Sequence, residues 1–389
     1  MINPEEYKAC KGYIKDQWRK LTAKTVKNKK LIIGLPNAYI CPSRDEFDKK
    51  MYYWDSYFII LGLLCDNKVT TAKGMAENLF YLFRTYGFIP QSNRFYHLGK
   101  SNPPLLTAII TELFPYVKSK TWLRKALKVA VGEYETVWTY GYRITPTGLS
   151  RYWEPTHTHE QAEDESGWDR TSRFFDRCLD ITPVDLNCLL YKYELDIADF
   201  YSILKDFTQA RYWKTKAVKR KKLINTCMWD SRRGFFFDLD YKQNKKTPAW
   251  SLAGFVPLWA GLADAEQAQR CANNLKYFEY PGGLVTTRRK YIRKGQRQWD
   301  YPIGWACLHW FVIKGLFDYG YREDAERIAE KWLNTCRKVF DKTGKFWEKY
   351  NVVKPGIGKV GRYPVQAGFG WSNGVFLKIL EMLSDSGQR

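Results

Sequence analysis

The sequence predicts an all-α fold built from pairs of helices, and three observations support this fold class. Apolar residues recur at helical spacing in about twelve segments of the chain, whereas the alternation typical of strands is sustained almost nowhere. The longer loop-like stretches tend to follow every second helical segment, as expected for successive helical hairpins. No stretch rich in Pro, Gly and Ser divides the chain, so we expect residues 1–389 to form a single domain.

The N-terminal part begins with a helix-start pattern. Residues 3–6, Asn-Pro-Glu-Glu, supply an N-cap, a proline at the first helical position and acids in the first turn. We expect this helix to extend to about residue 22. Residues 1–40 are then an N-terminal helix followed by a basic extension. The next two predicted helices cover residues 51–65 and 69–86.

Loops and one hairpin separate the remaining helical segments. Gly, Pro, Asn and Ser occur at loop density over residues 87–104, and residues 143–173 form a long polar segment. Two arginines and a glycine before three phenylalanines, at residues 232–237, predict a short β-hairpin. The other predicted helices cover residues 104–117, 122–140, 184–206, 209–229, 249–260, 263–275, 303–317, 322–340 and 373–384.

The charge of the chain raises nucleic acid as a partner. There are 63 Lys and Arg against 41 Asp and Glu, a formal net charge of +22. The densest basic runs, residues 24–30, 214–222 and 288–297, lie far apart in the sequence. We therefore interpret the charge as a solvated basic surface and expect no specific nucleic-acid partner.

Cysteine usage and hydropathy predict a soluble cytoplasmic protein. The nine cysteines are an odd number without a CxxC pair, which favours buried, reduced thiols over a disulfide framework. The first residues lack the basic-then-apolar layout of a signal peptide. The longest apolar run, residues 57–65, is too short to cross a bilayer. We expect no membrane partner, and no pattern in the sequence indicates an oligomeric state.

Metal and nucleotide chemistry are not indicated. Residues 157–160, His-Thr-His-Glu, lack the spacing of a His-Glu-x-x-His helical face. No glycine-rich phosphate loop, nucleophile elbow or dinucleotide motif occurs. We therefore expect no metal site and no cofactor.

Four acids, each directly preceded by a tryptophan, are the candidate catalytic groups. A carboxyl group beside an indole is poorly solvated when ionised, so its pKa tends to rise, as a general acid requires near neutral pH. Glycoside hydrolysis needs two carboxyl groups, and the aromatic content of 17% suits walls that stack on sugar rings. For each acid alone, a helix-capping or structural role is the alternative. The four are Asp55, Asp169, Asp300 and Glu348.

Together the segments around these acids resemble the trehalase family of inverting α-glycosidases. The resemblance covers about residues 40–380, and its most specific strings are Gln-Trp-Asp-Tyr-Pro at 298–302 and Gly-Phe-Gly-Trp at 368–371. It implies an (α/α)6 toroid, a six-hairpin barrel with short β-hairpins in the rim loops. The other matching segments are residues 51–64, 87–105, 165–173, 255–262, 282–287, 348–352 and 363–375.

The resemblance also implies roles for individual residues. Asp169, in Ser-Gly-Trp-Asp, matches the general acid, and Glu348, in Glu-Lys-Tyr, matches the general base. Trp54 and Asp55 match a pair that holds the glucosyl ring, and Gly167 matches a substrate-contacting glycine. The other expected substrate-binding residues are Arg44, Gln91, Lys100, Ser101, Asn102, Trp168, Arg173, Gln298, Trp299, Asp300, Trp305, Arg362, Tyr363, Phe369 and Trp371.

The chain departs from the family pattern around the second sugar. Gln91 and residues 100–102, Lys-Ser-Asn, replace Asn and Arg-Ser-Gln, and Arg44 follows Cys-Pro-Ser where the family has Pro-Gly-Gly-Arg-Phe. The family's Arg-Pro-Glu segment is missing after residues 151–153, and Arg362 stands where the family has Glu. The replacements at Gln91 and residues 100–102 keep the same chemical class, whereas the resemblance implies that Arg44, the missing segment and Arg362 stand at positions that largely serve the leaving-group glucose.

The function that the resemblance implies is hydrolysis of α,α-trehalose to two glucose molecules without a cofactor. One alternative is a related hydrolase for a substrate with an anionic leaving group, such as glucosylglycerate or mannosylglycerate, because Arg362 suits a carboxylate. A second alternative is a non-catalytic basic protein that binds carbohydrate or nucleic acid. Retention of both Asp169 and Glu348 favours an enzyme.

Overall fold

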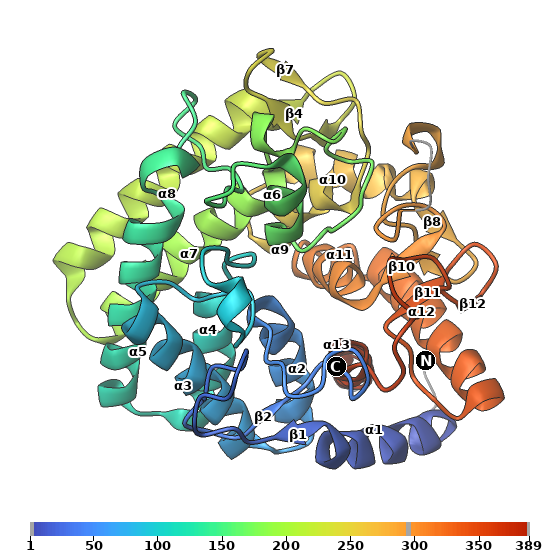
Figure 1. Ribbon diagram of the computed structural model, residues 1–389. Coiled ribbons are helices and arrows are strands. Elements are labelled where there is room, and N and C mark those ends of the chain that lie inside the picture. Colours follow the sequence, from blue (N-terminus) through green and yellow to red (C-terminus); the bar gives the residue numbers. More distant parts are fainter. Residues whose placement is uncertain (1–3, 293–296, 387–389) are drawn as a thin grey trace.

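The computed structural model describes residues 4–292 and 297–386, and its helices form a closed ring (Figure 1). Six inner helices contact one another in sequence order, and the last packs against the first. The ring closure that the sequence did not reveal is therefore made between the two ends of the chain. The inner helices are α2 (Tyr53–Cys65), α4 (Leu106–Val117), α7 (Val184–Ile203), α9 (Val256–Trp259), α11 (Ala306–Asp318) and α13 (Gly370–Ser386).

Six outer helices surround this ring. Five of them pack directly on inner helices, and α10 follows α9 and packs on β5. The architecture is an (α/α)6 barrel, which confirms the predicted fold class. The outer helices are α1 (Lys8–Leu21), α3 (Val69–Tyr86), α5 (Lys120–Glu133), α8 (Phe207–Met228), α10 (Ala265–Asn273) and α12 (Arg322–Thr343).

The contact that closes the ring is made by glycines. A Cβ on Gly62 of α2 would lie 2.4 Å from the Cα of Gly374 on α13, and one on Gly374 would lie 2.1 Å from the carbonyl oxygen of Phe58. The two helix backbones therefore touch directly. Helix α2 is mostly apolar and buried all round, with every residue from Tyr53 to Leu64 buried, as expected for an inner helix.

Short antiparallel strands lie in the loops between helices. Pairing of β10 with β11 sets Trp305 opposite Lys349 and so brings the loop before β10 beside Glu348. The strands are β1 (Thr22–Ala23), β2 (Tyr39–Ile40), β3 (Ile181–Thr182), β4 (Trp229–Asp230), β5 (Phe235–Phe236), β6 (Leu239–Asp240), β7 (Lys245–Lys246), β8 (Glu279–Tyr280), β9 (Gly283–Leu284), β10 (Ile303–Trp305), β11 (Lys349–Asn351) and β12 (Gly356–Ile357). Strand β1 pairs with β2, β4 with β5, β8 with β9, and the other six form two three-stranded sheets.

Most predicted helices agree with the structure to within a few residues, and the hairpin at 232–237 is confirmed as β4–β5. Three predictions are wrong. Residues 303–305 form strand β10, because a short apolar run fits either a strand or a helix. The helix expected over 249–260 is reduced to a 3-10 turn and the four residues of α9. The polar segment 143–173 contains an additional helix, α6 (His159–Glu165).

Smaller elements complete the description. The N-terminal helix begins as a 3-10 turn, η1 (Pro4–Tyr7), while the expected N-cap Asn3 lies outside the described residues. Helix α5 continues into a π-helical turn, η3 (Tyr134–Trp138). The other 3-10 turns are η2 (Phe95–His97), η4 (Gly141–Arg143), η5 (Cys178–Asp180), η6 (Leu252–Phe255), η7 (Leu275–Tyr277) and η8 (Arg289–Tyr291).

The interior is one continuous cluster of buried apolar side chains. All nine cysteines are free. Seven are buried, and Cys65 and Cys227 are half-buried. Within the described part of the chain, no helix combines the length and the apolar character needed to cross a membrane.

Candidate active site

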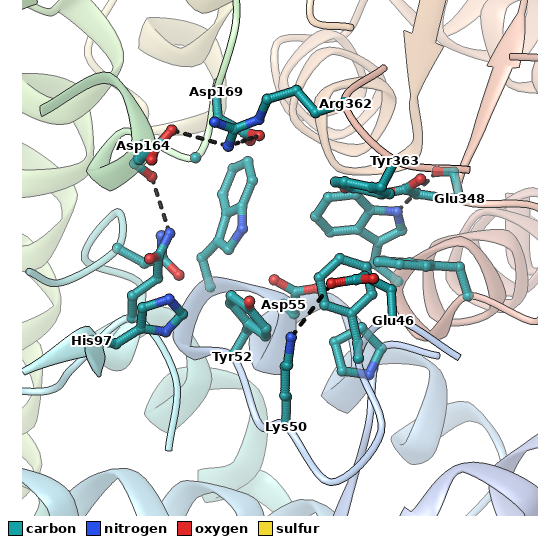
Figure 2. Close-up of a pocket in the computed structure, with 18 of the residues that line it drawn as sticks. Glu46, Lys50, Tyr52, Asp55, His97, Asp164, Asp169, Glu348, Arg362 and Tyr363 are labelled. Atoms are coloured by element: carbon teal, nitrogen blue, oxygen red, sulfur yellow. Dashed lines mark hydrogen bonds and ion pairs between the residues drawn. The ribbon is translucent and has the colours of Figure 1, made fainter. Parts of the chain in front are cut away.

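A cavity of about 510 Å³ opens among the loops that precede α2, follow α6, and flank β10 and β11 (Figure 2). Its volume lies within the range usual for small-molecule sites. The predicted residues that line it are Trp54, Asp55, Gln91, Lys100, Asn102, Gly167, Asp169, Trp299, Trp305, Glu348, Arg362, Tyr363, Phe369 and Trp371. Both predicted catalytic carboxyl groups therefore lie in one cavity.

Asp169 accepts three hydrogen bonds at the upper side of the cavity in Figure 2. Its Oδ2 accepts from Gln298 Nε2 at 2.7 Å and from Arg362 Nη2 at 3.1 Å. Its Oδ1 accepts a longer bond from Trp299 Nε1 at 3.3 Å. Burial, with the nearby charge of Asp164, raises the pKa of Asp169 to about 7 despite the opposing effect of Arg362. A carboxyl group with this pKa is partly protonated at neutral pH.

Glu348 lies on another side of the cavity in Figure 2 and is almost fully buried. Its Oε1 accepts a hydrogen bond from the Tyr363 hydroxyl at 2.6 Å, and its Oε2 accepts one from Lys349 Nζ at 3.2 Å. Burial raises the pKa of Glu348, and the Lys349 ammonium and the Tyr363 hydroxyl oppose that rise. The backbone is anchored by a bond from Glu348 N to Gln366 O at 2.9 Å.

Asp55 is a third acid in the cavity. It lies in the first turn of α2 and is buried. Desolvation raises its pKa well above the ordinary value, and the nearby Glu348 and Asp169 add to this effect. A group in this state can donate a hydrogen bond to a sugar hydroxyl as well as accept one.

Stacked tryptophans form one wall of the cavity, and the backbone of Gly167 lies close against the ring of Trp54. Trp299 stacks on Trp305 with ring centroids 3.9 Å apart, and on Trp168 at 5.6 Å. Gly167 has φ +76°, and a Cβ there would lie 2.7 Å from the Trp54 ring. Both the left-handed conformation and this close approach require glycine. The glycine of Ser-Gly-Trp-Asp thus lets Trp54 and Asp169 face the same space.

Arg362 bridges the acids at the rim of the cavity. Besides Asp169, its Nη2 lies 3.3 Å from Asp164 Oδ1, and its Nη1 lies 3.9 Å from Glu160 Oε1. The side chain is 43% exposed, so these pairs are only partly shielded from solvent. The cation that replaces the family's glutamate is engaged by protein carboxylates and not left free for a ligand.

Six residues expected to bind substrate lie outside the cavity lining. Trp168 is buried behind Trp299, and Gln298 is buried between Asp169 and Lys349. Arg44 turns outward, where it donates to the carbonyl of Lys20 and pairs with Asp48 at 2.6 Å. The other three are Ser101, Arg173 and Asp300, whose side chains are committed to the protein itself.

Arg173 and Asp300 hold the Ser-Gly-Trp-Asp loop in place. The Arg173 guanidinium is fully buried between Asp185 and Asp238, with bonds of 2.6 to 2.7 Å. Asp300 accepts from the backbone N–H of Ser172 at 3.0 Å and from its hydroxyl at 2.6 Å. Both satisfy the rule that buried charges are paired or hydrogen-bonded. The structure therefore places them as supports of the cavity wall.

Ser101 has a similar supporting place. Its N–H donates to Glu165 Oε1 at 2.8 Å, and its hydroxyl donates to the carbonyl of Ile89 at 2.6 Å. Glu165 also holds Arg143 through two bonds of 2.6 Å. This buried pair fixes the loop from which Lys100 and Asn102 reach the cavity.

Several lining residues were not predicted from the sequence. Tyr52, Tyr96 and His97 lie inside the matching segments 51–64 and 87–105, and Asp164 directly precedes segment 165–173, so their position in the sequence was a usable indication. Glu46 and Lys50 form an ion pair of 3.8 Å, but nothing in their sequence context distinguishes them from other surface pairs. The unpredicted lining residues are Pro42, Glu46, Phe47, Lys50, Tyr52, Tyr96, His97 and Asp164.

The charge of the lining is not basic, although that of the chain is. Five acids line the cavity, namely Glu46, Asp55, Asp164, Asp169 and Glu348, against the three bases Lys50, Lys100 and Arg362. Among the described residues, no group of three or more His, Cys, Asp and Glu has a metal-binding arrangement. The lining suits a neutral polyhydroxylated ligand better than a polyanion.

Known proteins that are similar to this chain in sequence match it over nearly its whole length. The model of the trehalase family matches residues 1–164 and 156–384. The periplasmic trehalase of Escherichia coli O8 is 32% identical over 432 residues, covering 98% of this chain and 75% of that protein. The cytosolic neutral trehalase of Saccharomyces cerevisiae is 33% identical over 445 residues, covering 92% of this chain and 58% of that protein.

Two solved structures are similar in fold. The neutral trehalase Nth1 from Saccharomyces cerevisiae has a TM-score of 0.80 at 33% identity, covering 88% of this chain and 73% of its own. A mannosylglycerate hydrolase from Thermus thermophilus has a TM-score of 0.72 at 18% identity, covering 95% of this chain and 99% of its own. At that identity the second likeness concerns the fold alone.

Proposed function

This chain belongs to the trehalase family, and from that membership and the geometry of its cavity we propose that it hydrolyses α,α-trehalose to two glucose molecules with inversion. One observation carries the proposal. The two carboxyl groups that match the family's acid and base, 179 residues apart in sequence (348 minus 169), line one cavity in different hydrogen-bonding environments.

The proposed reaction uses Asp169 as general acid and Glu348 as general base. Asp169 transfers its proton to the glycosidic oxygen while the bond from that oxygen to the anomeric carbon breaks. Glu348 takes a proton from a water molecule whose oxygen attacks the same carbon from the opposite face. One glucose leaves with the protonated oxygen, and the other is formed as the β-anomer. Exchange with solvent then returns the proton to Asp169 and removes it from Glu348.

The aromatic and polar lining would hold the two sugar rings. Trp54, Trp299 and Trp371 would stack on the sugar rings, and Asp55, which lines the same cavity, would bind hydroxyl groups of the ring that is cleaved. Gln91, Lys100 and Asn102 also line the cavity and can donate hydrogen bonds to sugar hydroxyl groups. The proposed reaction requires no cofactor.

The alternative substrate class, a sugar with an anionic leaving group, rests on Arg362. In the structure this cation is already paired with Asp164 and Asp169. An incoming carboxylate would have to displace them in a lining that contains more acids than bases. This arrangement favours the neutral disaccharide.

We further propose that the whole chain acts as a single catalytic domain and that it functions in the cytoplasm. The continuous apolar core supports the first proposal. The nine free cysteines support the second, because disulfides persist mainly in oxidising compartments. Similar proteins include both periplasmic and cytosolic trehalases, so measuring the location of the tagged protein by cell fractionation is the test.

The substrate is tested with a glucose-release assay on trehalose, maltose, glucosylglycerate and mannosylglycerate. We expect trehalose to be preferred. Arg362→Glu restores the charge usual in the family and should keep or improve trehalose cleavage. A protein that ignores trehalose, cleaves one of the glycerate conjugates, and loses that activity in Arg362→Glu would overturn the assignment in favour of the anionic leaving group.

A further inference from the structure

A buried glutamine and a buried lysine connect the two proposed catalytic carboxyl groups. Lys349 Nζ lies 3.2 Å from Glu348 Oε2 and 2.9 Å from Gln298 Oε1. The amide nitrogen of Gln298 lies 2.7 Å from Asp169 Oδ2. Neither side chain reaches the cavity lining, and Lys349 is fully buried. A continuous hydrogen-bonded link therefore runs behind the cavity wall from Glu348 to Asp169.

The chemistry of lysine determines the direction of every bond in this link. An ammonium group has donors only, so the atom of Gln298 that faces it must be the carbonyl oxygen. The amide N–H groups of Gln298 then point at Asp169. The loop backbone covers the link closely, because a Cβ on Gly361 would lie 2.8 Å from Gln298 Oε1 and 3.0 Å from Lys349 Nζ. Rotation of the amide would set its N–H groups against the ammonium.

The link has opposite effects at its two ends. At Glu348 it presents a cation, which favours the ionised form that a base requires. At Asp169 it presents a neutral N–H to Oδ2, which already accepts from Arg362. With both lone-pair directions of Oδ2 occupied by donors, the acidic proton is carried by Oδ1. The ammonium group of Lys349 therefore lies beside the proposed base, Glu348, and the side-chain amide of Gln298 separates it from the proposed acid, Asp169.

We infer that Gln298 and Lys349 are positioning residues that keep Glu348 ionised and Asp169 protonated on Oδ1. The inference rests on the roles proposed above for the two carboxyl groups. Besides the link, the described charged or titratable groups that interact with Asp169 or Glu348 are Tyr52, Asp55, Glu163, Asp164, Arg362 and Tyr363. These groups remain unchanged when the link is altered, so the link can be tested separately.

The test is the pH profile of kcat/KM for trehalose in Lys349→Met and Gln298→Glu. Removing the cation beside Glu348 should move the acidic limb of the Lys349→Met profile upward by roughly 1 to 3 pH units. The nearly isosteric Gln298→Glu keeps a partner for Lys349 but replaces the N–H donor to Asp169 with a carboxylate. Its alkaline limb should therefore move upward by roughly one unit or more.

Lys192→Met is the matched control, because Lys192 pairs with Asp196 at 2.7 Å on α7, outside the cavity lining. Its profile should stay unchanged.

Equal loss of activity at all pH values, with the acidic and alkaline limbs of the profile unmoved, would mean that the link is only structural. If Lys349→Met fails to fold, Gln298→Glu decides the question. If Asp169→Asn and Glu348→Gln retain activity in the same assay, the proposed function fails first; if both lose it while the limbs stay, only the present inference fails.

Discussion

Arg362 Nη2 lies 3.1 Å from Oδ2 of Asp169, so a rim cation contacts the proposed general acid directly. The same nitrogen lies 3.3 Å from Asp164, whose negative charge raises the pKa of Asp169. Arg362 therefore offsets part of that effect. Burial raises the pKa of Asp169, and two charges of opposite sign adjust it further: Asp164 near the end of helix α6 raises it, and Arg362, 193 positions away in sequence (362 minus 169), lowers it.

A pH prediction follows from that contact. Asp169 must be protonated to donate, and its pKa is raised to about 7, so kcat/KM should fall as the pH rises through about 7. Arg362 lowers the pKa of Asp169, so Arg362→Met should move this fall to higher pH by roughly one unit or more. Arg327→Met is the control, because Arg327 pairs with Glu279 on the surface. An Arg362→Met profile that falls at the same pH or lower would contradict the prediction.

Replacing either proposed catalytic carboxyl group should abolish most activity. Asp169→Asn cannot donate the proton and Glu348→Gln cannot accept one, so each should lower kcat by on the order of a hundredfold or more. Circular dichroism should show an intact fold. Glu163→Gln is the control, because Glu163 is a nearby buried acid, with its pKa raised to about 8, that does not line the cavity. Its kcat should be kept. Activity retained in either catalytic variant would rule out the assigned role.

The stereochemistry of the product tests the mechanism independently. In an inverting enzyme, water enters opposite the departing oxygen, so trehalose should release β-glucose first. Time-resolved NMR of the anomeric proton detects this before mutarotation equilibrates the anomers. Initial release of α-glucose as the newly formed anomer would mean that a nucleophile replaces the base assigned to Glu348.

Gly167 should tolerate no side chain. Gly167→Ala places a Cβ 2.7 Å from Trp54 and also forces alanine to φ +76°, whereas Gly320→Ala has a similar φ of +82° with nothing within 4 Å. Both variants should lose roughly 1–2 kcal/mol of stability from the backbone conformation. Only Gly167→Ala should lose a further ~1–3 kcal/mol from overlap and show weaker binding of trehalose. Thermal unfolding and KM measure the two effects, and equal losses in both variants would remove the proposed role of the Trp54 contact.

Binding to nucleic acid should be weak and sensitive to salt. The most basic outer helix, α8, has Lys or Arg at positions 211, 214, 216, 219, 220, 221 and 222 and no Asp or Glu. Fluorescence anisotropy with a labelled DNA duplex should show binding that is lost at physiological salt, as expected for phosphate contacts alone. Tight, salt-resistant and sequence-selective binding would support the nucleic-acid alternative.

The helical pairs and the two catalytic candidates were accessible from the sequence, because both are local properties. Apolar spacing along one helix depends only on residues three and four apart, and it predicted α3 and α7 to within three residues at either end. The Trp-Asp and Trp-Glu pairs marked four candidate acids through their neighbours in the chain, and the resemblance to the trehalase family singled out Asp169 and Glu348 among them. Strand β10 was missed for the same reason, since its identity comes from pairing with β11.

The tertiary structure decided which polar residues face the ligand and which hold the wall. Arg173 ends the predicted segment 165–173, and Arg362 directly precedes the predicted segment 363–375. Arg173 is buried in ion pairs with Asp185 and Asp238, whereas Arg362 contacts Asp169 at the rim of the cavity. Likewise, ring closure depends on backbone contact between Gly62 and Gly374, 312 positions apart (374 minus 62). A charged or small residue takes its role from the partner that the fold brings to it, and partners so distant in the chain leave no periodic trace around either residue.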